Sequence, residues 1–458
     1  MDQDSLDKLL KKYDRPGPRY TSYPMVPVWT ENYGAGDYEQ ALKALAEKPD
    51  EPLSFYLHVP FCRQRCWFCG CNTTTLKNES THEEYLRTVA RECDLVVRHL
   101  GGRKKVSQIH WGGGTPSCMN SELTVRAFEI FSERFSFTDN AEISIEIDPR
   151  VTDYEKIDIL HHLGFNRLSF GIQDFDKEIQ HAIGRNQDQT KAVQLYSYCR
   201  QIGYTGINFD LIYGLPLQTL FRFKENIRRT IELKPDRVAL YSFAYLPNSK
   251  LHQKKIDNSL LPSAGEKLQL FLTAREMFLE SGYRQIGLDH FVRPSDELAR
   301  AREQGKLRRN FMGYTVRAAK DWIGLGMSSI SYVDDNFAQN VSDLKKYGET
   351  IEQSKFAIQR GLKLSQDDKI RQYAISQLMC NFMLDKSDLE DKFGIKFENY
   401  FEPEIIELEK FKQDNLLEER DNKLMITEAG RLFIRNIAME FDIYLRQGDL
   451  KVQFSRTV

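Results

Sequence analysis

The residues with the clearest chemical potential lie in the segment CRQRCWFCGC, which runs from Cys62 to Cys71 and holds four of the eight cysteines. Cys62, Cys66 and Cys69 have the spacing C-x3-C-x2-C. Three thiolates on one short loop can bind three irons of a cubane cluster and leave the fourth iron open to a small chelating ligand. The segment therefore predicts an iron–sulfur site with one open coordination position.

Cys71 leaves a second interpretation open, because four cysteines can also bind a structural zinc ion. Structural zinc usually takes two separated pairs of ligands, so this compact spacing favours the cluster. The first residues, MDQDSLDKLLKKYDRPGPRY, lack the apolar run of a signal peptide. We therefore expect a cytoplasmic protein, in which thiols stay reduced and disulfides are disfavoured.

The overall composition excludes some classes of partner. The chain has 458 residues and a formal net charge of −2, so it has no bulk field that would attract nucleic acid. An anionic substrate would have to be bound by local arginines and lysines. We find no run of about 18 consecutive apolar residues and expect no membrane span.

Six short apolar or β-branched runs alternate with helical patterns from about residue 53 onwards. The runs are LSFYLHVPF, SQIHWGGGTP, EISIEIDP, RLSFGIQDF, GINFDLIYGLP and RVALYSFAYLP. Six strand–helix units predict a parallel sheet with right-handed crossovers, open or curled into a partial barrel. Ligands bind at the carboxyl ends of such strands, and the cysteine segment directly follows the first run.

The remaining chain divides into further parts. Residues 1–50 are predicted to form an N-terminal arm and helix, because the stretch RPGPRYTSYP, Arg15 to Pro24, excludes regular structure. Residues 51–365 would form the catalytic domain, although the pattern becomes less regular from RQIGLDHFVRP to about residue 362. Residues 366–458 would form a separate, mainly helical C-terminal domain.

Other residues with functional potential follow the same strands. The segment WGGGTP, Trp111 to Pro116, permits close backbone approach to a ligand, although a tight strand-to-helix turn would also use its glycines. Glu146 could accept hydrogen bonds from ribose hydroxyls, with Glu142 and Asp148 as competing candidates. Four further residues could line the same rim: Gln173, Arg185, Asp210 and Ile212.

The cysteine spacing, with Phe68 directly before Cys69, resembles the motif of the radical S-adenosylmethionine superfamily. The resemblance implies a [4Fe–4S] cluster on three cysteines, with S-adenosylmethionine chelating the open iron and WGGGTP bonding its methionine amino group. One-electron reduction would then yield a 5′-deoxyadenosyl radical that abstracts an unactivated hydrogen. The implied fold is α/β: a partial (β/α)6 TIM-like barrel with an N-terminal arm and a mainly helical C-terminal domain.

Nearly the whole chain is similar to the family of oxygen-independent coproporphyrinogen III oxidases, also called coproporphyrinogen dehydrogenases. The resemblance rests on PGPRYTSYP, YLHVPFC, CWFCGC, HWGGGTP, EIDPR, FNRLSFGIQDF, NFDLIYGLP, DHF, RNFMGYT and RNIAMEFDIYLR, in that order. It implies an oxidoreductase of haem biosynthesis that decarboxylates two propionates of coproporphyrinogen III to vinyls, giving protoporphyrinogen IX. An electron donor, a terminal electron acceptor and two molecules of S-adenosylmethionine are also implied, and we expect a monomer.

The family's contacts can be carried over onto matching positions. Contacts to a first S-adenosylmethionine would be Tyr56, Gly113, Glu146 and Ile330. Contacts to a second would be Phe68, Gly114, Thr115, Gln173, Arg185, Asp210, Ile212 and Ala244. The catalytic set would be Tyr56, Glu146, Phe311, Met312 and Ile330. The arm residues Arg19, Tyr20 and Tyr23 would close over the porphyrinogen, with Arg308, Arg309 and Arg317 as further candidates for its carboxylates.

One departure from the family concerns Met312. The usual pattern reads like NFQGYTT, whereas this chain has NFMGYTV, and a thioether cannot hydrogen-bond as a glutamine amide does.

Three alternatives remain open: a haem chaperone of the same superfamily, a radical enzyme that opens or methylates haem, and a zinc-stabilised tetrapyrrole scaffold. Cys71, the family's non-ligand cysteine, and the PGPRYTSYP arm favour the dehydrogenase over the chaperone.

Overall fold

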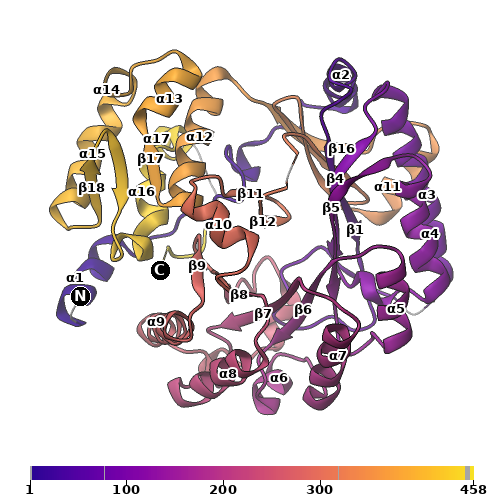
Figure 1. Ribbon diagram of the computed structural model, residues 1–458, viewed down its shortest axis with the longest axis horizontal. Helices are drawn as coiled ribbons and strands as arrows, with labels where there is room; N and C mark the ends of the chain where they lie inside the picture. The colour runs from indigo at the N-terminus through magenta and orange to yellow at the C-terminus, as the bar shows by residue number, and fades with distance from the viewer. Residues whose placement is uncertain (1–2, 77, 318, 449–453, 458) are drawn as a thin grey trace.

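The computed structural model describes residues 3–76, 78–317, 319–448 and 454–457 (Figure 1). Its centre is a sheet of twelve strands in the order β16-β15-β14-β13-β1-β4-β5-β6-β7-β8-β10-β9. Seven neighbouring strands, from β13 to β8, run parallel. Both edges of the sheet continue in antiparallel strands.

The six predicted strand–helix units are confirmed. Their strands are β1 (Leu53–Val59), β4 (Lys105–Gly113), β5 (Ser136–Ile147), β6 (Arg167–Gln173), β7 (Ile207–Tyr213) and β8 (Arg237–Ser242). The helices that follow them are α3 (Ser80–His99), α4 (Ser121–Ser132), α5 (Tyr154–His162), α6 (Lys177–Ala182), α7 (Gln189–Gln201), α8 (Leu220–Leu233) and α9 (Ala264–Glu280).

The alternation of residues in β7 shows why these strands form and what they present. Phe209 and Leu211 are buried in the core cluster that includes residues of the surrounding helices. Asn208 and Asp210, which alternate with them, line the cavity inside the barrel. Successive side chains of a strand point to opposite faces, so one face packs on the helices and the other faces the barrel interior.

The less regular region after residue 283 contains short strands. They are β9 (Arg284–Ile286), β10 (His290–Val292), β11 (Arg308–Asn310), β12 (Gly313–Thr315), β13 (Trp322–Leu325), β14 (Ile330–Val333), β15 (Asn336–Asn340) and β16 (Ile358–Lys363). Helices α10 (Glu297–Glu303) and α11 (Leu344–Glu352) lie between them. Each of these strands has only three to six residues, which is too short for a period of two to stand out in the sequence.

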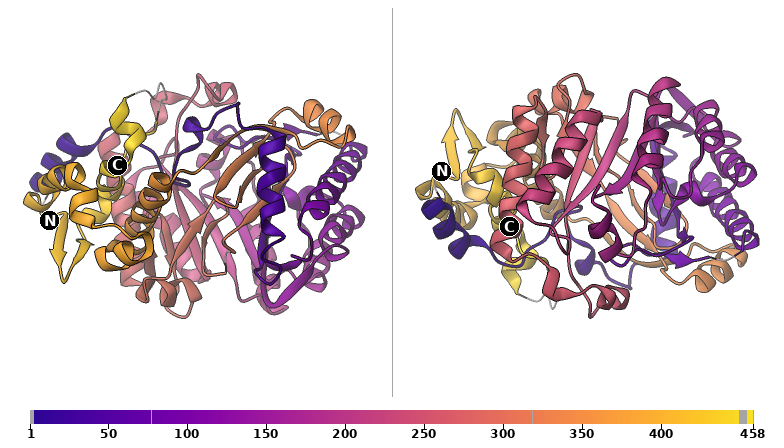
Figure 2. Two further views of the ribbon diagram at one scale, coloured as in Figure 1. Left: turned by 90° about the horizontal axis from the view of Figure 1, so that it is seen from above. Right: turned by 90° about the horizontal axis from the view of Figure 1, so that it is seen from below.

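The C-terminal part is mainly helical from residue 366. It holds α12 (Gln366–Asn381), α13 (Lys386–Phe393), α14 (Phe397–Tyr400), α15 (Glu402–Gln413), α16 (Ile434–Glu440) and α17 (Ile443–Gln447). A small sheet in the order β17-β19-β18 completes it, formed by β17 (Met383–Asp385), β18 (Leu417–Arg420) and β19 (Lys423–Ile426). In Figures 1 and 2 this part lies beyond β9 and α9, at the end of the molecule opposite α3 and α4.

The first fifty residues divide between two cores. Helix α1 (Gln3–Tyr13) and the segment after it contribute buried Leu6 and Met25 to the core of the C-terminal part. Helix α2 (Ala35–Leu45) contributes Leu42 to the core of the barrel. The three-part division at residues 50 and 365 remains a prediction. None of the helices in the described part of the chain has the length and apolar character that crossing a bilayer requires.

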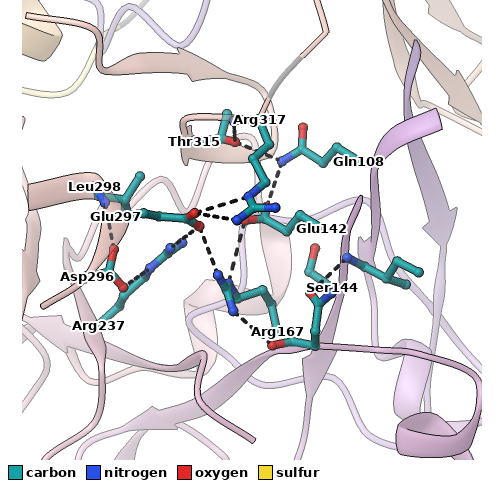
Figure 3. A network of polar contacts seen from close by, with 12 residues as sticks. Gln108, Glu142, Ser144, Arg167, Arg237, Asp296, Glu297, Leu298, Thr315 and Arg317 are labelled. Atoms are coloured by element: carbon teal, nitrogen blue, oxygen red, sulfur yellow. Dashed lines mark hydrogen bonds and ion pairs between the residues drawn. The ribbon is translucent and has the colours of Figure 1, made fainter. Parts of the chain in front are cut away.

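A network of ion pairs closes the barrel at the amino ends of its strands (Figure 3). Glu297, at the start of α10, pairs with Arg167 at 2.9 Å, Arg237 at 3.2 Å and Arg317 at 3.0 Å. Burial raises the pKa of Glu297, but these arginines outweigh burial and hold the pKa below its usual value. The network ties β6, β8 and the segment after β12 to one carboxylate.

Glu297→Gln should lower the free energy of unfolding by about 2–3 kcal/mol, because it leaves three half-buried arginines without their shared carboxylate. Urea unfolding followed by circular dichroism measures the effect. The matched control is Glu303→Gln, an exposed residue of the same helix, for which we expect a change within about 0.5 kcal/mol. Equal effects of the two substitutions would show that the network does not stabilise the barrel.

Candidate active site

The cysteine loop leaves the sheet directly after β1. Cys62 ends the short strand β2 (Phe61–Cys62), which pairs with β3 (Thr74–Thr75) and so closes the loop at its base. Cys62 and Cys66 are buried, Cys69 is half-buried and Cys71 is exposed. The three predicted ligands therefore lie on the inner part of the loop, while the fourth cysteine lies at its outer side.

Each of the three inner sulfurs accepts hydrogen bonds. The Thr115 hydroxyl donates to Cys62 Sγ at 3.3 Å, and the backbone N–H of Cys71 donates to Cys69 Sγ at 3.4 Å. Two guanidinium groups donate to Cys66 Sγ: Arg150 at 3.4 Å and Arg185 at 3.6 Å. Such donors stabilise negatively charged sulfur, as the thiolate ligands of an iron–sulfur cluster require.

The thiols differ in acidity for physical reasons. Burial raises the pKa of Cys62 to about 11, whereas a hydrogen bond from the Cys71 side chain lowers the pKa of Cys69 to about 7. A bound metal deprotonates a coordinating thiol outright, so iron would hold even buried Cys62 as a thiolate. Among the residues that the structure describes, no three His, Cys, Asp or Glu side chains are grouped so as to hold one metal ion. The hydrogen bonds to all three inner sulfurs fit thiolate ligands of a cluster.

The glycine segment after β4 packs directly on the cysteine loop. Gly114 N–H donates to Val59 O at 2.7 Å, and Thr115 N–H donates to Phe61 O at 2.8 Å. A Cβ at Gly114 would lie 2.7 Å from the backbone of Phe61, and Gly113 has a φ of +111°. The glycines allow the glycine segment to approach the cysteine loop closely. The sequence had suggested two other reasons for them, approach to a ligand or a tight turn.

A polar group from three neighbouring strands lies beside these loops. The hydroxyl of Tyr56 is 3.1 Å from His58 Nδ1, and its ring stacks on His110 at a centroid distance of 6.0 Å. His110 Nε2 lies 3.6 Å from Glu146 Oε1. Burial lowers the pKa of His58, so its imidazole is neutral. A Cβ at Gly112 would collide with Glu146, which places this carboxylate against the glycine segment.

The competing carboxylates have other partners. Asp148 pairs with Arg150 at 2.6 Å and with Arg185 at 3.1 Å. Burial raises the pKa of Asp148, but the two arginines outweigh burial and the net shift is downward. Glu142 accepts a hydrogen bond from Gln108 in the closed end of the barrel. Glu146, with 42% of its side chain exposed, is the carboxylate of the three that is available to a ligand.

The barrel interior holds a cavity of about 760 Å³, part of which is open to solvent. Glu146, Asp210, Tyr241, His290 and Met312 are among its lining residues. Burial, followed by the charge of Glu146, raises the pKa of Asp210 to about 6. The cavity therefore combines the carboxylates of Glu146 and Asp210 with aromatic groups, and Arg167 and Arg237 from the amino ends of β6 and β8 also line it.

Some residues that the sequence did not indicate support the loop. Gln253 Nε2 donates to Phe68 O at 3.0 Å and to Ala244 O at 3.1 Å, so it joins two predicted cofactor contacts. His252 Nε2 lies 2.7 Å from Cys69 O. Phe68 packs on the apolar cluster that contains Ile212. Nothing in the sequence links residues 252 and 253 to the cysteines, because the tertiary fold alone brings these segments together.

Other predicted residues lie elsewhere in the site. Gln173 ends β6 with a φ of +66°. Ile330 and Phe311 pack in an apolar cluster with Trp29, whose ring meets Phe311 edge-on at 6.1 Å. Arg317 belongs to the ion pairs at the closed end of the barrel, and Arg308 is exposed.

The arm residues are bound to the C-terminal part. The Tyr20 hydroxyl donates to Asp442 at 2.9 Å, and the Tyr23 hydroxyl accepts from the N–H of Ile443 at 3.3 Å. Both tyrosines are buried in the C-terminal core. Arg19 donates to Ser242 O at the carboxyl end of β8. The role of these residues in substrate binding stays a prediction.

Comparisons with known proteins agree with this site. Residues 56–230 match the model of the radical SAM superfamily, and residues 364–433 match the HemN C-terminal domain. The fold and the site thus define a radical SAM enzyme, which uses a [4Fe–4S] cluster and S-adenosylmethionine.

The relatives define the family more closely. The chain is 42% identical to the oxygen-independent coproporphyrinogen III oxidase of Escherichia coli over 98% of both chains. It is also 42% identical to that of Synechocystis, over 98% of this chain and 97% of the relative. The solved structure of the E. coli enzyme superposes with a TM-score of 0.90 at 41% identity, covering 93% of this chain and 97% of that one. The chain belongs to the oxygen-independent coproporphyrinogen III oxidase family, which confirms the predicted fold and family and does not favour the chaperone or haem-modifying alternatives.

Thr115→Val should make the cluster harder to reduce. The substitution removes the O–H donor to Cys62 Sγ at nearly constant volume, and hydrogen bonds to sulfur raise the reduction potential of a cluster. We expect the potential to fall by tens of millivolts in an anaerobic redox titration followed by electron paramagnetic resonance. Thr115→Ser keeps the hydroxyl and is the matched control. An unchanged potential in the valine variant would mean that this hydrogen bond does not reach the cluster.

Proposed function

We propose that this protein converts two propionates of coproporphyrinogen III to vinyl groups without oxygen, giving protoporphyrinogen IX. The observation that carries the proposal is the joining of the cysteine loop to the glycine segment at the mouth of the barrel cavity. Thr115 links the two segments by its hydroxyl and by its backbone N–H. The family membership supplies the substrate.

When bound, the cluster and S-adenosylmethionine supply a radical that can take a hydrogen atom from an unactivated carbon. The chain's own residues hold and shield that chemistry. Arg150, Arg185 and Thr115 donate to the cysteine sulfurs. Glu146, which lies against Gly112, would accept hydrogen bonds from ribose hydroxyls. The ion pairs around Glu297 join the amino ends of the strands at the far end of the barrel.

The electron balance defines the partners. Each propionate loses one hydrogen atom from its β-carbon, then carbon dioxide and one electron, as the vinyl double bond forms. The protein therefore needs a donor that reduces the cluster and an acceptor that takes the last electron. We place the protein in the cytoplasm, where the cysteines stay reduced, and propose that it acts as a monomer.

An anaerobic turnover assay tests the proposal. The reconstituted protein, S-adenosylmethionine, a reductant, an electron acceptor and coproporphyrinogen III should give a product lighter by two carboxyl groups, together with 5′-deoxyadenosine. Cys66→Ser should abolish both products, because it removes a cluster ligand. Cys71→Ser is the matched control and should retain them, because the backbone N–H of residue 71 still donates to Cys69. If the protein with an intact cluster bound haem but left coproporphyrinogen III unchanged, the proposed function would be wrong and a haem chaperone would be favoured.

Met312→Gln tests whether the cavity works as in the family. Met312 lines the barrel cavity, and its backbone N–H donates to Asn310 Oδ1 at 2.9 Å, a hydrogen bond that a side-chain substitution leaves in place. A glutamine amide would add a donor and an acceptor, and we expect turnover to be preserved or raised. Met312→Leu controls for the loss of the thioether. A large loss of activity in the glutamine variant would show that this chain binds its ligand differently here.

A further inference from the structure

A second cavity lies outside the barrel interior, where the arm, β7, β8, α9 and the C-terminal part meet. It encloses about 720 Å³ of empty space, part of it open to solvent. Six basic side chains line it: Arg19, Lys267, Arg309, Arg431, Arg435 and Arg456. Among its described lining residues Asp289 is the one carboxylate. This strong local positive charge contrasts with the net charge of −2 of the whole chain.

Two of the six cations already have carboxylate partners. Arg431 pairs with Glu428 at 2.6 Å and Arg456 with Asp14 at 2.5 Å. Even so, Arg431 Nε is buried with no hydrogen-bond partner among the described residues. These two arginines therefore contribute little net charge to the cavity, but Arg431 retains an unused donor.

The other four cations form no ion pair within the part of the chain that the structure describes. Arg19 donates to Ser242 O at 3.0 Å and Lys267 to Phe243 O at 2.6 Å. Arg435 donates to the backbone of the arm. Arg309 lies over the ring of Tyr314 at 5.0 Å. Backbone carbonyls and a ring face satisfy donors, but they do not neutralise charge.

The electrostatic consequence is visible in the acidity of two side chains. Burial, followed by the charge of Arg19, lowers the pKa of Lys267 to about 8 and that of Arg435 to about 10. Burial raises the pKa of Asp289, but His290, Arg309 and Arg19 outweigh burial and lower the pKa to about 2, so this carboxylate offsets one of the positive charges. The remaining buried charges lack a counterion, which is costly, and a bound anion would relieve the cost. The fold thus maintains a cationic cavity whose complement is negative.

The rest of the lining defines the class of anion. Six apolar or aromatic side chains separate the cations: Tyr213, Leu240, Leu268, Phe271, Leu288 and Leu432. Inorganic phosphate would leave such walls without a partner. A carboxylate on a hydrocarbon arm, attached to an aromatic ring, would match both kinds of surface, because a guanidinium binds a carboxylate with two parallel hydrogen bonds.

The cavity lies across the barrel mouth from the cysteine loop. Tyr213 and Ser242, the last residues of β7 and β8, line it, whereas the cysteine loop follows β1. Five strand spacings of about 4.8 Å separate β1 from β8, or roughly 24 Å along the curved sheet. In Figure 1 the C-terminal part, which contributes one wall, lies on the side of β9 and α9, away from α3.

The cavity also borders the barrel interior. Asp289 lines the outer cavity and His290 the inner one, and Tyr241 and Ser242 of β8 divide in the same way. Because successive residues of a strand point to opposite faces, β8 separates the two cavities, and a ligand at the barrel mouth would reach both around the carboxyl end of β8, at Ser242.

We propose that this outer cavity binds the carboxylates that the reaction does not remove. The inference rests on the proposed function, in which two of the four propionates of coproporphyrinogen III remain in the product. The reacting propionates must lie near the cysteine loop, so the retained ones point toward the opposite side of the mouth. Lys267, Arg309 and Arg435 then determine specificity for a tetrapyrrole that carries propionates on its far edge.

The test measures binding to the reconstituted holoenzyme under anaerobic conditions. Three probes are titrated by fluorescence: coproporphyrin III, with four carboxylates, protoporphyrin IX, with only the two retained ones, and the tetramethyl ester of coproporphyrin III. The variants are Lys267→Gln and Arg309→Gln. Lys224→Gln, an exposed lysine of α8 outside the cavity, is the matched control.

We expect each cavity variant to bind both acids about tenfold more weakly, the effect of one charge-assisted hydrogen bond, and the ester as the unaltered protein does. Arg309→Lys, which keeps the charge, should recover part of the loss, and the control should change nothing. Unchanged affinity for both acids would overturn the proposal. A loss confined to coproporphyrin III would also overturn it, because the cavity would then hold the reacting carboxylates.

The turnover assay separates this inference from the proposed function. Cavity variants should raise KM for coproporphyrinogen III, whereas Lys224→Gln should leave both KM and the rate of S-adenosylmethionine cleavage unchanged. The unaltered protein could fail to decarboxylate coproporphyrinogen III while the cavity variants still bind the two porphyrin acids more weakly. In that case the proposed function would be wrong, but the carboxylate-binding site would be supported.

Discussion

The structure depends on holding the sulfur atoms of Cys62, Cys66 and Cys69 at one end of the barrel. The loop after β1 that carries them has little regular structure of its own. The hydrogen bonds that hold them come from different strand–helix units. Thr115 follows β4, Arg150 follows β5 and Arg185 lies beyond α6, yet all three donate to sulfur within the loop after β1. The parallel register of the sheet is what brings these ends to one rim, so the geometry of the cysteines depends on the whole barrel.

The charges of the molecule are sorted by region although they nearly cancel overall. The barrel interior presents Glu146 and Asp210, the closed end is sealed by arginines around Glu297, and the outer cavity is cationic. Arg167 and Arg237 also line the barrel interior, so its charges are mixed, whereas the cations of the outer cavity favour a bound carboxylate.

The N-terminal segment links the two cores of the protein. Arg435 of α16 donates to Pro18 O in the arm and to Arg456 O near the C-terminus. One side chain therefore holds both segments. Arg19, the next residue of the arm, then reaches Ser242 at the end of β8. The C-terminal part is therefore connected to the barrel by the hydrogen bonds of the arm as well as by direct packing.

The sequence by itself determined the local chemistry and the class of fold. The spacing of Cys62, Cys66 and Cys69, the glycines before Thr115 and the six apolar runs are properties of short segments, and short segments are where residue type and periodicity carry information. The tertiary structure alone decided which carboxylate faces the cavity. Glu142, Glu146 and Asp148 alternate on one strand, and only their partners from distant segments distinguish them. It also decided the place of Gln253, the strands of three to six residues after 283 and the cationic outer cavity. These depend on contacts between residues far apart in the chain, for which no local pattern exists.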